Sequence, residues 1–276
     1  PLSHVREICD AHDIALIEDC AHAFFGRSEG RPIGSWGDYA IASLTKFFPV
    51  TEGGCLISHH HPLNGLKLAR RPLHSSLRIL ADAVELSVTH RRLAGLNLIL
   101  GLAFGAKRKL RRRPLLAAPA HTHHGLGDAV RRAHSDFAPN ALPFSDIARA
   151  TWAIVRAGGN ARTVRLRQTN YAGLTERLSR LENAHPLQPD CGPDAAPYVF
   201  PLWVDKPDEV YQRVRRSGVP VFRWDDRWPG TPELPDDWGK QWSHHVFQLG
   251  CHQDLTTADL DWIAETLSTI LDGVRQ

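Results

Sequence analysis

The sequence predicts an α/β protein, with a mixed, mostly parallel sheet in its first half and a smaller α/β domain at its C-terminus. Residues 14–18 form a continuous apolar run that ends in acids, which is typical of a parallel strand covered on both faces. Residues 198–271 alternate between strand and helix patterns, as a small α/β domain does. Hydrophobic residues make up 42% of the 276 residues, which is enough for a substantial core.

Local patterns place the elements of the first half. Apolar residues on one face predict a short helix over residues 3–12, with Ser3 as its N-cap. After the strand at residues 14–18, two further short strands are expected at residues 39–43 and 54–58. Residues 62–88 have a mostly helical pattern.

The second half is predicted in the same way. Thr256 and Asp259 have the spacing of a capping box, which predicts the start of the last helix. A segment with four prolines and a glycine, residues 186–197, is expected to be an irregular linker. We expect helices over residues 145–158, 161–181, 207–217 and 257–271, and strands over residues 198–204, 219–224 and 246–249.

Composition excludes some classes of function. The net charge is only +3, and 33 basic residues are mixed with 30 acidic ones, which argues against a dedicated nucleic-acid binder. The five cysteines are odd in number and scattered, which favours a reduced, cytoplasmic setting over a disulfide framework. The first residues lack a basic-then-apolar signal pattern. Because the chain contains no Met, we expect it to be a fragment, a processed chain or a truncated product.

Lys46 is the residue most suggestive of chemistry. It is one of six lysines, and no other acidic or basic residue lies between Asp38 and Glu52. A lysine among apolar residues loses hydration, which disfavours its ammonium form. The neutral amine is the form that makes a Schiff base with an aldehyde. The alternative is an ordinary lysine in a turn after a strand.

Asp19 supplies the partner that such a lysine needs. It lies at the end of the first predicted strand, and Lys46 follows the next strand along the chain. An acid that keeps a pyridinium nitrogen protonated and a lysine that holds an aldehyde are the pair that a pyridoxal phosphate site requires. Asp19 has an alternative role as a strand-end acid that caps the next helix.

Three linked blocks carry a resemblance to a known family. They are residues 17–23 (IEDCAHA), residues 34–40 (GSWGDYA) and residues 43–54 (SLTKFFPVTEGG). In order and spacing they resemble the DegT/DnrJ/EryC1/StrS family of pyridoxal-phosphate-dependent sugar aminotransferases, which have the fold type I architecture. The resemblance implies a partial cofactor-binding large domain over residues 1–135 and a small α/β domain over residues 136–276.

The resemblance also implies roles for individual side chains. Asp19 would pair with the ring nitrogen of pyridoxal 5'-phosphate, and Lys46 would be the catalytic residue that binds its aldehyde. His22 would lie near the ring hydroxyl, where many members carry Gln, although it could equally be a core histidine. Ser43 would reach the cofactor phosphate. Ser43 and Lys46 are three residues apart, a tighter spacing than many members show, which we interpret as a shorter loop.

Arg223 is the candidate for binding substrate. It closes a predicted strand in the C-terminal domain, which faces the substrate in fold type I enzymes. Its guanidinium could hold a carboxylate or a phosphate as a bidentate fork. The alternative is a surface ion pair with Asp225 or Asp226.

The function implied by the resemblance is transfer of an amino group from an amino-acid donor to a nucleotide-linked keto-sugar, by a homodimer with shared sites. A lysine rather than a histidine at position 46 favours transamination over the dehydratase branch of the family. The alternative is a catalytically inactive truncated homologue that acts as a scaffold or partner in glycan assembly. It draws support from residues 140–144, where Pro143 replaces an arginine of the family pattern.

Two other features invite different interpretations. Residues 93–106 are almost wholly apolar and precede a basic run at residues 107–113. The apolar run is too short for a bilayer core of about 30 Å, so this segment could lie at an anionic membrane surface or pack on the sheet. Some cysteines and histidines are also candidates for zinc ligands or for a nucleophile pair. The candidates are Cys55 with His59, His60 and His61; His121, His123 and His124; and Cys251 with His252.

Overall fold

The computed structural model describes residues 1–89, 93, 95–97, 99–102, 145–192, 195–224, 231–232 and 234–273. They form two compact units, and the predicted α/β class with a partly parallel sheet is confirmed. The first unit consists of Pro1–Ala42, Leu56–His60 and Gly159–Gln276, and the second of Ser43–Cys55 and His61–Gly158. The predicted boundary at residue 135 lies outside the described residues and stays a prediction.

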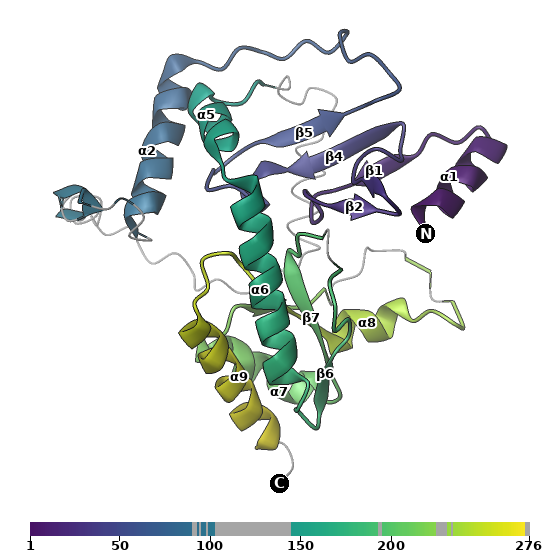
Figure 1. The fold of residues 1–276 in the computed structure, drawn as a ribbon, viewed down its shortest axis with the longest axis vertical. Coiled ribbons are helices and arrows are strands. Elements are labelled where there is room, and N and C mark those ends of the chain that lie inside the picture. Colours follow the sequence, from purple (N-terminus) through teal and green to yellow (C-terminus); the bar gives the residue numbers. More distant parts are fainter. Residues whose placement is uncertain are drawn as a thin grey trace. The chain divides into compact units, whose positions relative to one another are not determined.

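The N-terminal sheet has the strand order β1-β4-β5 (Figure 1). β1 (Ile17–Asp19) pairs in parallel with β4 (Tyr39–Ser43), and the register sets Asp19 opposite Ile41. The third strand, β5 (Gly54–Ile57), matches the strand expected at residues 54–58. A small antiparallel pair, β2 (Arg27–Ser28) with β3 (Arg31–Pro32), was not predicted.

The expected run of buried residues in the first strand is wrong. The strand begins only at Ile17, whose side chain is 60% exposed, whereas Glu18 is 7% exposed. The Glu18 carboxylate accepts hydrogen bonds from three backbone amides, those of Gly34 (3.0 Å), Trp36 (2.6 Å) and Gly37 (2.7 Å). A buried carboxylate is tolerated where several donors replace its water, and this one holds the turn that leads into β4.

The helix α1 (Leu2–Ala11) also begins earlier than predicted. Ser3 lies inside the helix instead of at the N-cap, and its hydroxyl donates to Glu29. The Glu29 carboxylate also accepts the amides of Leu2 (2.6 Å) and Ser3 (3.3 Å). A carboxylate from the turn between β2 and β3 therefore does the capping that sequence alone assigned to a serine.

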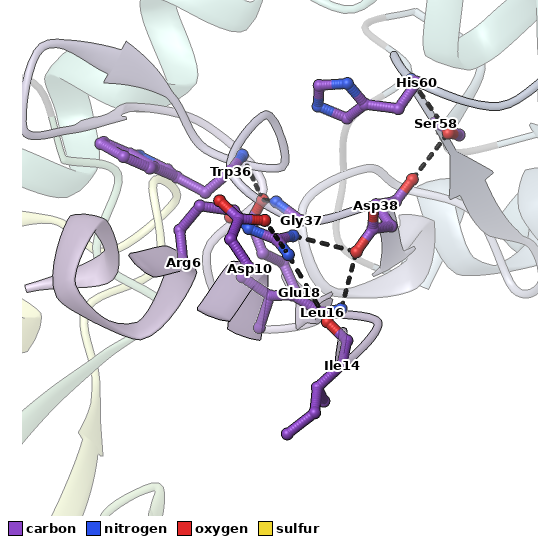
Figure 2. Close-up of polar contacts among 10 residues, drawn as sticks. All are labelled: Arg6, Asp10, Ile14, Leu16, Glu18, Trp36, Gly37, Asp38, Ser58 and His60. Atoms are coloured by element: carbon purple, nitrogen blue, oxygen red, sulfur yellow. Dashed lines mark hydrogen bonds and ion pairs between the residues drawn. The ribbon is translucent and has the colours of Figure 1, made fainter. Parts of the chain in front are cut away.

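Arg6 ties α1 to the strand ends (Figure 2). Its guanidinium pairs with Asp38 at 2.9 Å and with Asp10 at 2.6 Å. The same Asp38 oxygen accepts the amide of Leu16 at 2.8 Å, and the Asp38 carbonyl accepts the hydroxyl of Ser58 at 2.6 Å. The hydrogen bond with Asp38 is the main cause of a raised Arg6 pKa. This network fixes the start of β4 against β1.

The second unit contains the short 3-10 helix η1 (Leu44–Lys46), α2 (Leu73–Thr89) and α5 (Arg149–Ala157). The helix expected over residues 62–88 forms only from Leu73, directly after Pro72, because a proline cannot continue a helix that precedes it. α2 and α5 pack on each other. No helix among the described residues is long and apolar enough to cross a membrane. Most of residues 93–113 lie outside the described part, so membrane-surface contact stays a prediction.

The C-terminal sheet is antiparallel with the order β6-β7-β9-β8, and helices pack on one of its faces (Figure 1). Phe200, Leu202 and Val204 alternate along β7 as fully buried residues that face the helices. The elements are α6 (Asn160–Leu178), β6 (Ala184–Pro186), β7 (Val199–Val204), α7 (Pro207–Ser217), β8 (Val221–Phe222), α8 (Gly239–His245), β9 (Val246–Gly250) and α9 (Thr257–Asp272).

The capping box of the last helix is confirmed. The amide of Asp259 donates to the Thr256 hydroxyl at 3.3 Å, and the Asp259 carboxylate accepts the Thr256 amide at 2.7 Å. The Thr256 amide and hydroxyl both donate to this carboxylate, and these two bonds lower the pKa of Asp259. Neither β6 nor α8 was predicted. In the case of β6, the strand has only three residues and ends in a proline.

We expect Gly37→Ala to destabilise the protein by about 2 kcal/mol or more. A Cβ at position 37 would lie 2.7 Å from the carbonyl oxygen of Tyr39 and 2.8 Å from that of Leu16, so the backbone must move. Urea unfolding followed by circular dichroism measures the change. Gly65→Ala is the matched control, because nothing lies within 4 Å of its added Cβ. Equal unfolding midpoints for the two variants would contradict this account.

Candidate active site

The four predicted cofactor residues divide between the two units. Asp19 and His22 belong to the first unit, and Ser43 and Lys46 belong to the second. Each pair follows the carboxyl end of a strand, since Asp19 ends β1 and Ser43 ends β4. β1 and β4 are parallel, and ligands of α/β sheets bind outside the carboxyl ends of such strands. That both pairs serve one cofactor stays a prediction.

Asp19 is exposed at the end of β1. Its Oδ1 atom accepts the amide of Ala21 at 2.9 Å, and the amide of Cys20 donates to the Ile41 carbonyl at 2.7 Å. Asp19 therefore caps a turn and not a helix, because the next element is the strand β2. An exposed carboxylate held by a short turn is suited to pair with a protonated nitrogen.

His22 lies in the turn that follows Asp19 and is partly buried. Its imidazole stacks on the ring of Tyr198, with centroids 4.5 Å apart and planes 9° apart. The indole of Trp224 lies 5.5 Å away and is tilted by 48°. His22 also lines a pocket of about 280 Å³, together with Phe25, Tyr198 and other residues of the same unit. It is thus a pocket residue with aromatic neighbours, and not a fully buried core histidine.

Lys46 ends the 3-10 helix η1 and is partly buried; Phe47, which follows it, and Leu44, two residues before it, are buried. The hydroxyl of Ser43 lies 3.2 Å from that of Thr45. Gly53 closes this segment, because its carbonyl accepts the Leu44 amide at 3.0 Å. Its φ of +108°, and a Cβ position only 2.7 Å from Leu44 Cδ1, require glycine there. The backbone after Lys46 thus follows a tight path that only glycine allows at position 53.

Glu52 is an organising residue of the second unit that the sequence analysis missed. Its carboxylate pairs with Arg71 at 2.5 Å and accepts the Ala148 amide at 2.8 Å and the Thr151 hydroxyl at 3.1 Å. Arg71 also donates to the carbonyl of Asp146 at 3.1 Å. The acid directly before the Gly-Gly pair was a visible signal, but its partners are about 20 and 100 residues away in sequence.

Arg223 is engaged within the C-terminal domain. Its guanidinium pairs with Asp208 at 2.8 Å and lies 4.4 Å above the ring of Tyr211. The partners considered from sequence, Asp225 and Asp226, lie outside the described residues. The hydrogen bond from Arg223 is the main cause of a lowered Asp208 pKa. Substrate binding by Arg223 stays a prediction.

The metal and nucleophile alternatives gain no support. Among the described residues, no three His, Cys, Asp or Glu side chains gather as a metal site would require. This set includes Cys55 and the histidines 59–61, whereas histidines 121, 123 and 124 lie outside it. Cys251 is fully buried and donates to the Pro197 carbonyl at 3.4 Å. Burial raises the pKa of the Cys251 thiol to about 12, so it remains protonated and unreactive.

Residues 1–66 match the model of the DegT/DnrJ/EryC1/StrS aminotransferase family. This stretch contains Asp19, His22, Ser43 and Lys46 in the order described above. The match covers the first 66 of the 276 residues, so this part of the chain is similar to the family. The resemblance seen in the three sequence blocks is thereby confirmed.

Parts of the chain are also similar in sequence to two named proteins. The chain is 39% identical over 75 residues to an L-glutamine:2-deoxy-scyllo-inosose aminotransferase of Streptoalloteichus tenebrarius, which is 26% of this chain and 16% of the relative. It is 35% identical over 60 residues to the GDP-perosamine synthase of Vibrio cholerae, which is 21% of this chain and 16% of that protein. The matched stretches are thus a small part of each relative.

Solved structures extend the similarity along the whole chain. DesI, crystallised in the presence of its TDP-sugar product, aligns with a TM-score of 0.60 at 16% identity and covers 99% of this chain and 60% of DesI. Helicobacter pylori PseC, an aminotransferase involved in the biosynthesis of pseudoaminic acid, aligns at 0.58 and 12% identity over 99% of this chain and 63% of PseC. The chain thus spans about three fifths of these neighbours, and it has the fold type I architecture.

We expect Glu52→Gln to destabilise the protein by about 1–3 kcal/mol. This is less than the loss of a fully buried ion pair would cost, because the side chains of Glu52 and Arg71 are both partly exposed. The variant leaves Arg71 without its carboxylate, so the double variant Glu52→Gln/Arg71→Gln should cost less than the sum of the single changes. Urea unfolding measures each step. Arg78→Gln, which breaks an exposed contact of 4.0 Å with Asp82, is the matched control and should have almost no effect. Strict additivity of the two changes would refute the coupling.

Arg223→Gln should raise the pKa of Asp208 toward the ordinary range of aspartates, because the main cause of its lowered pKa is removed. A carboxylate with a lowered pKa stabilises the fold at pH values above its unfolded pKa, and this contribution disappears as the pH falls through its folded pKa. Titration of the Asp208 carboxyl carbon by NMR measures the shift. Arg177→Gln, which breaks a similar pair with Asp261 at 2.7 Å, should leave Asp208 unchanged. An unmoved Asp208 titration in Arg223→Gln would disprove the assignment.

Proposed function

We propose that this protein is a pyridoxal-phosphate-dependent aminotransferase that moves an amino group from an amino-acid donor to a keto-sugar in sugar or glycan biosynthesis. The observation that carries the proposal is the family match over residues 1–66, which contains the acid, the histidine, the serine and the lysine of the predicted site. The substrate class draws support from DesI, which was crystallised with a TDP-sugar product, and from the GDP-perosamine synthase. The donor class draws support from the L-glutamine aminotransferase.

The chemistry of the four side chains fits pyridoxal 5'-phosphate. When bound, the cofactor would supply an aldehyde for amines and a ring that accepts electrons from the reacting carbon. Asp19 would hold a proton on the ring nitrogen, for which its exposed carboxylate is suited. Lys46 would hold the aldehyde, and its freed amine would then carry the proton between two carbons. His22 would face the ring hydroxyl, and Ser43 would donate to the phosphate.

The same proposal includes the oligomeric state, the cellular setting and a residue for binding substrate. Members of the family with shared sites are dimers, so we expect a homodimer in which each copy completes the other's site. The five cysteines are all free, which agrees with a reduced, cytoplasmic setting. Arg223 is retained as a candidate for binding an anionic group of the substrate, because it is the guanidinium that follows β8.

Borohydride reduction of the purified chain with pyridoxal 5'-phosphate, followed by peptide mass mapping, tests the proposal. We expect one phosphopyridoxyl label on Lys46, because it is partly buried while the other lysines that the structure describes are exposed. The label should be lost in Lys46→Ala and kept in the matched variant Lys67→Ala, which removes an exposed lysine. Asp19→Ala should bind the cofactor more weakly while Lys46 remains present.

The labelling experiment can also reject the proposal. A label spread over surface lysines, or no label, would reject the proposal for this chain. The catalytically inactive homologue that acts as a scaffold in glycan assembly would then be the better account. Co-sedimentation with anionic liposomes, compared between the natural chain and one with residues 107–113 neutralised, decides separately whether a membrane surface is involved.

A further inference from the structure

The aromatic contact of His22 joins two distant segments of the first unit, the turn after β1 and the residues before β7. Tyr198 comes directly before β7, and its ring lies nearly parallel to the imidazole, 4.5 Å away. Stacked aromatic rings at this separation attract each other beyond the effect of the area that they bury. The Trp224 indole, tilted by 48° at 5.5 Å, is a second aromatic neighbour of the imidazole. The plane of His22 is therefore set by two residues that lie about 175 and about 200 positions away in sequence.

The backbone that carries Tyr198 is held by buried groups. The Pro197 carbonyl accepts hydrogen bonds from Arg167 at 3.1 Å and from the Cys251 thiol at 3.4 Å. Arg167 is only 1% exposed, and its Nε atom donates to Gln253 at 2.8 Å. Gln168 donates to the carbonyl of Ala195 at 2.9 Å. A side chain mounted on such a fixed segment makes a rigid support, whereas one on a free loop would not.

We propose that Tyr198 is a positioning residue, which stacks on His22 and fixes the plane in which its imidazole meets the cofactor. The inference rests on the proposed function, because His22 has a cofactor to meet only if the chain binds pyridoxal 5'-phosphate. A ring fixed in one plane loses less conformational entropy when it makes a hydrogen bond to a ligand. The C-terminal domain thus contributes to cofactor binding through one aromatic side chain that does not touch the reacting atoms.

The first measurement needs no cofactor. NMR of the imidazole resonances in the full chain should show the His22 ring protons shifted upfield, because they lie over the face of a phenol ring. His22→Gln assigns the resonance among the 16 histidines. Tyr198→Leu should move it downfield, toward the range of exposed histidines, although Trp224 remains nearby. Tyr198→Phe, which keeps the ring, should leave it in place. Trp238→Leu is the matched control, since it removes an exposed aromatic residue for which no ring contact with His22 is described.

The second measurement is the dissociation constant for pyridoxal 5'-phosphate in the same variants. Tyr198→Leu should weaken binding about 2- to 10-fold relative to Tyr198→Phe, the effect expected when one aromatic stack is lost. Equal affinities of these two variants, with Lys46 still labelled in the natural chain, would overturn the positioning role alone. An unshifted His22 resonance in the natural chain would overturn it as well. Failure of the natural chain to bind the cofactor would reject both this inference and the proposed function.

Discussion

The buried carboxylate of Glu18 is the constraint on which the N-terminal sheet depends. Three amides of the turn at residues 34–37 converge on it, so the chain can enter β4 only along one path. Removing the charge would leave three buried donors without a partner, and each such donor costs about 1–3 kcal/mol. Side chains alternate along a strand, so a buried Glu18 places Asp19 on the opposite face, where it is exposed. The acid that holds the fold therefore determines where the acid proposed for the cofactor points.

Several elements could be predicted because the information is local. The strand at residues 39–43 and the helix at residues 207–217 have the predicted bounds, and a Pro–Gly pair brackets the helix. The capping box of Thr256 and Asp259 was also visible, because both partners lie within one turn. The three blocks around Asp19 and Lys46 predicted the family for a similar reason. Their spacing is a property of one short stretch of chain.

The rest could not be predicted, because it depends on partners far away in sequence. The serine expected to cap the first helix is replaced in that role by Glu29, about 27 residues downstream. Glu18 was seen only as part of an acidic strand end, and nothing local shows that three amides come to it. Glu52 meets Arg71, Ala148 and Thr151 only after the chain has folded. These are contacts between segments, which a periodicity or a motif does not encode.

The C-terminal domain shows how a core can serve a site at its edge. Arg167 is a buried cation whose pKa is lowered by burial, and it persists because Pro197 and Gln253 supply acceptors. An apolar residue there would fill the same space at lower desolvation cost, but it would leave the Pro197 carbonyl with a weaker anchor. That carbonyl precedes Tyr198, on which His22 stacks. Burying Arg167 costs free energy of folding. The simplest explanation for its presence is that it holds the backbone before Tyr198, whose ring stacks on His22.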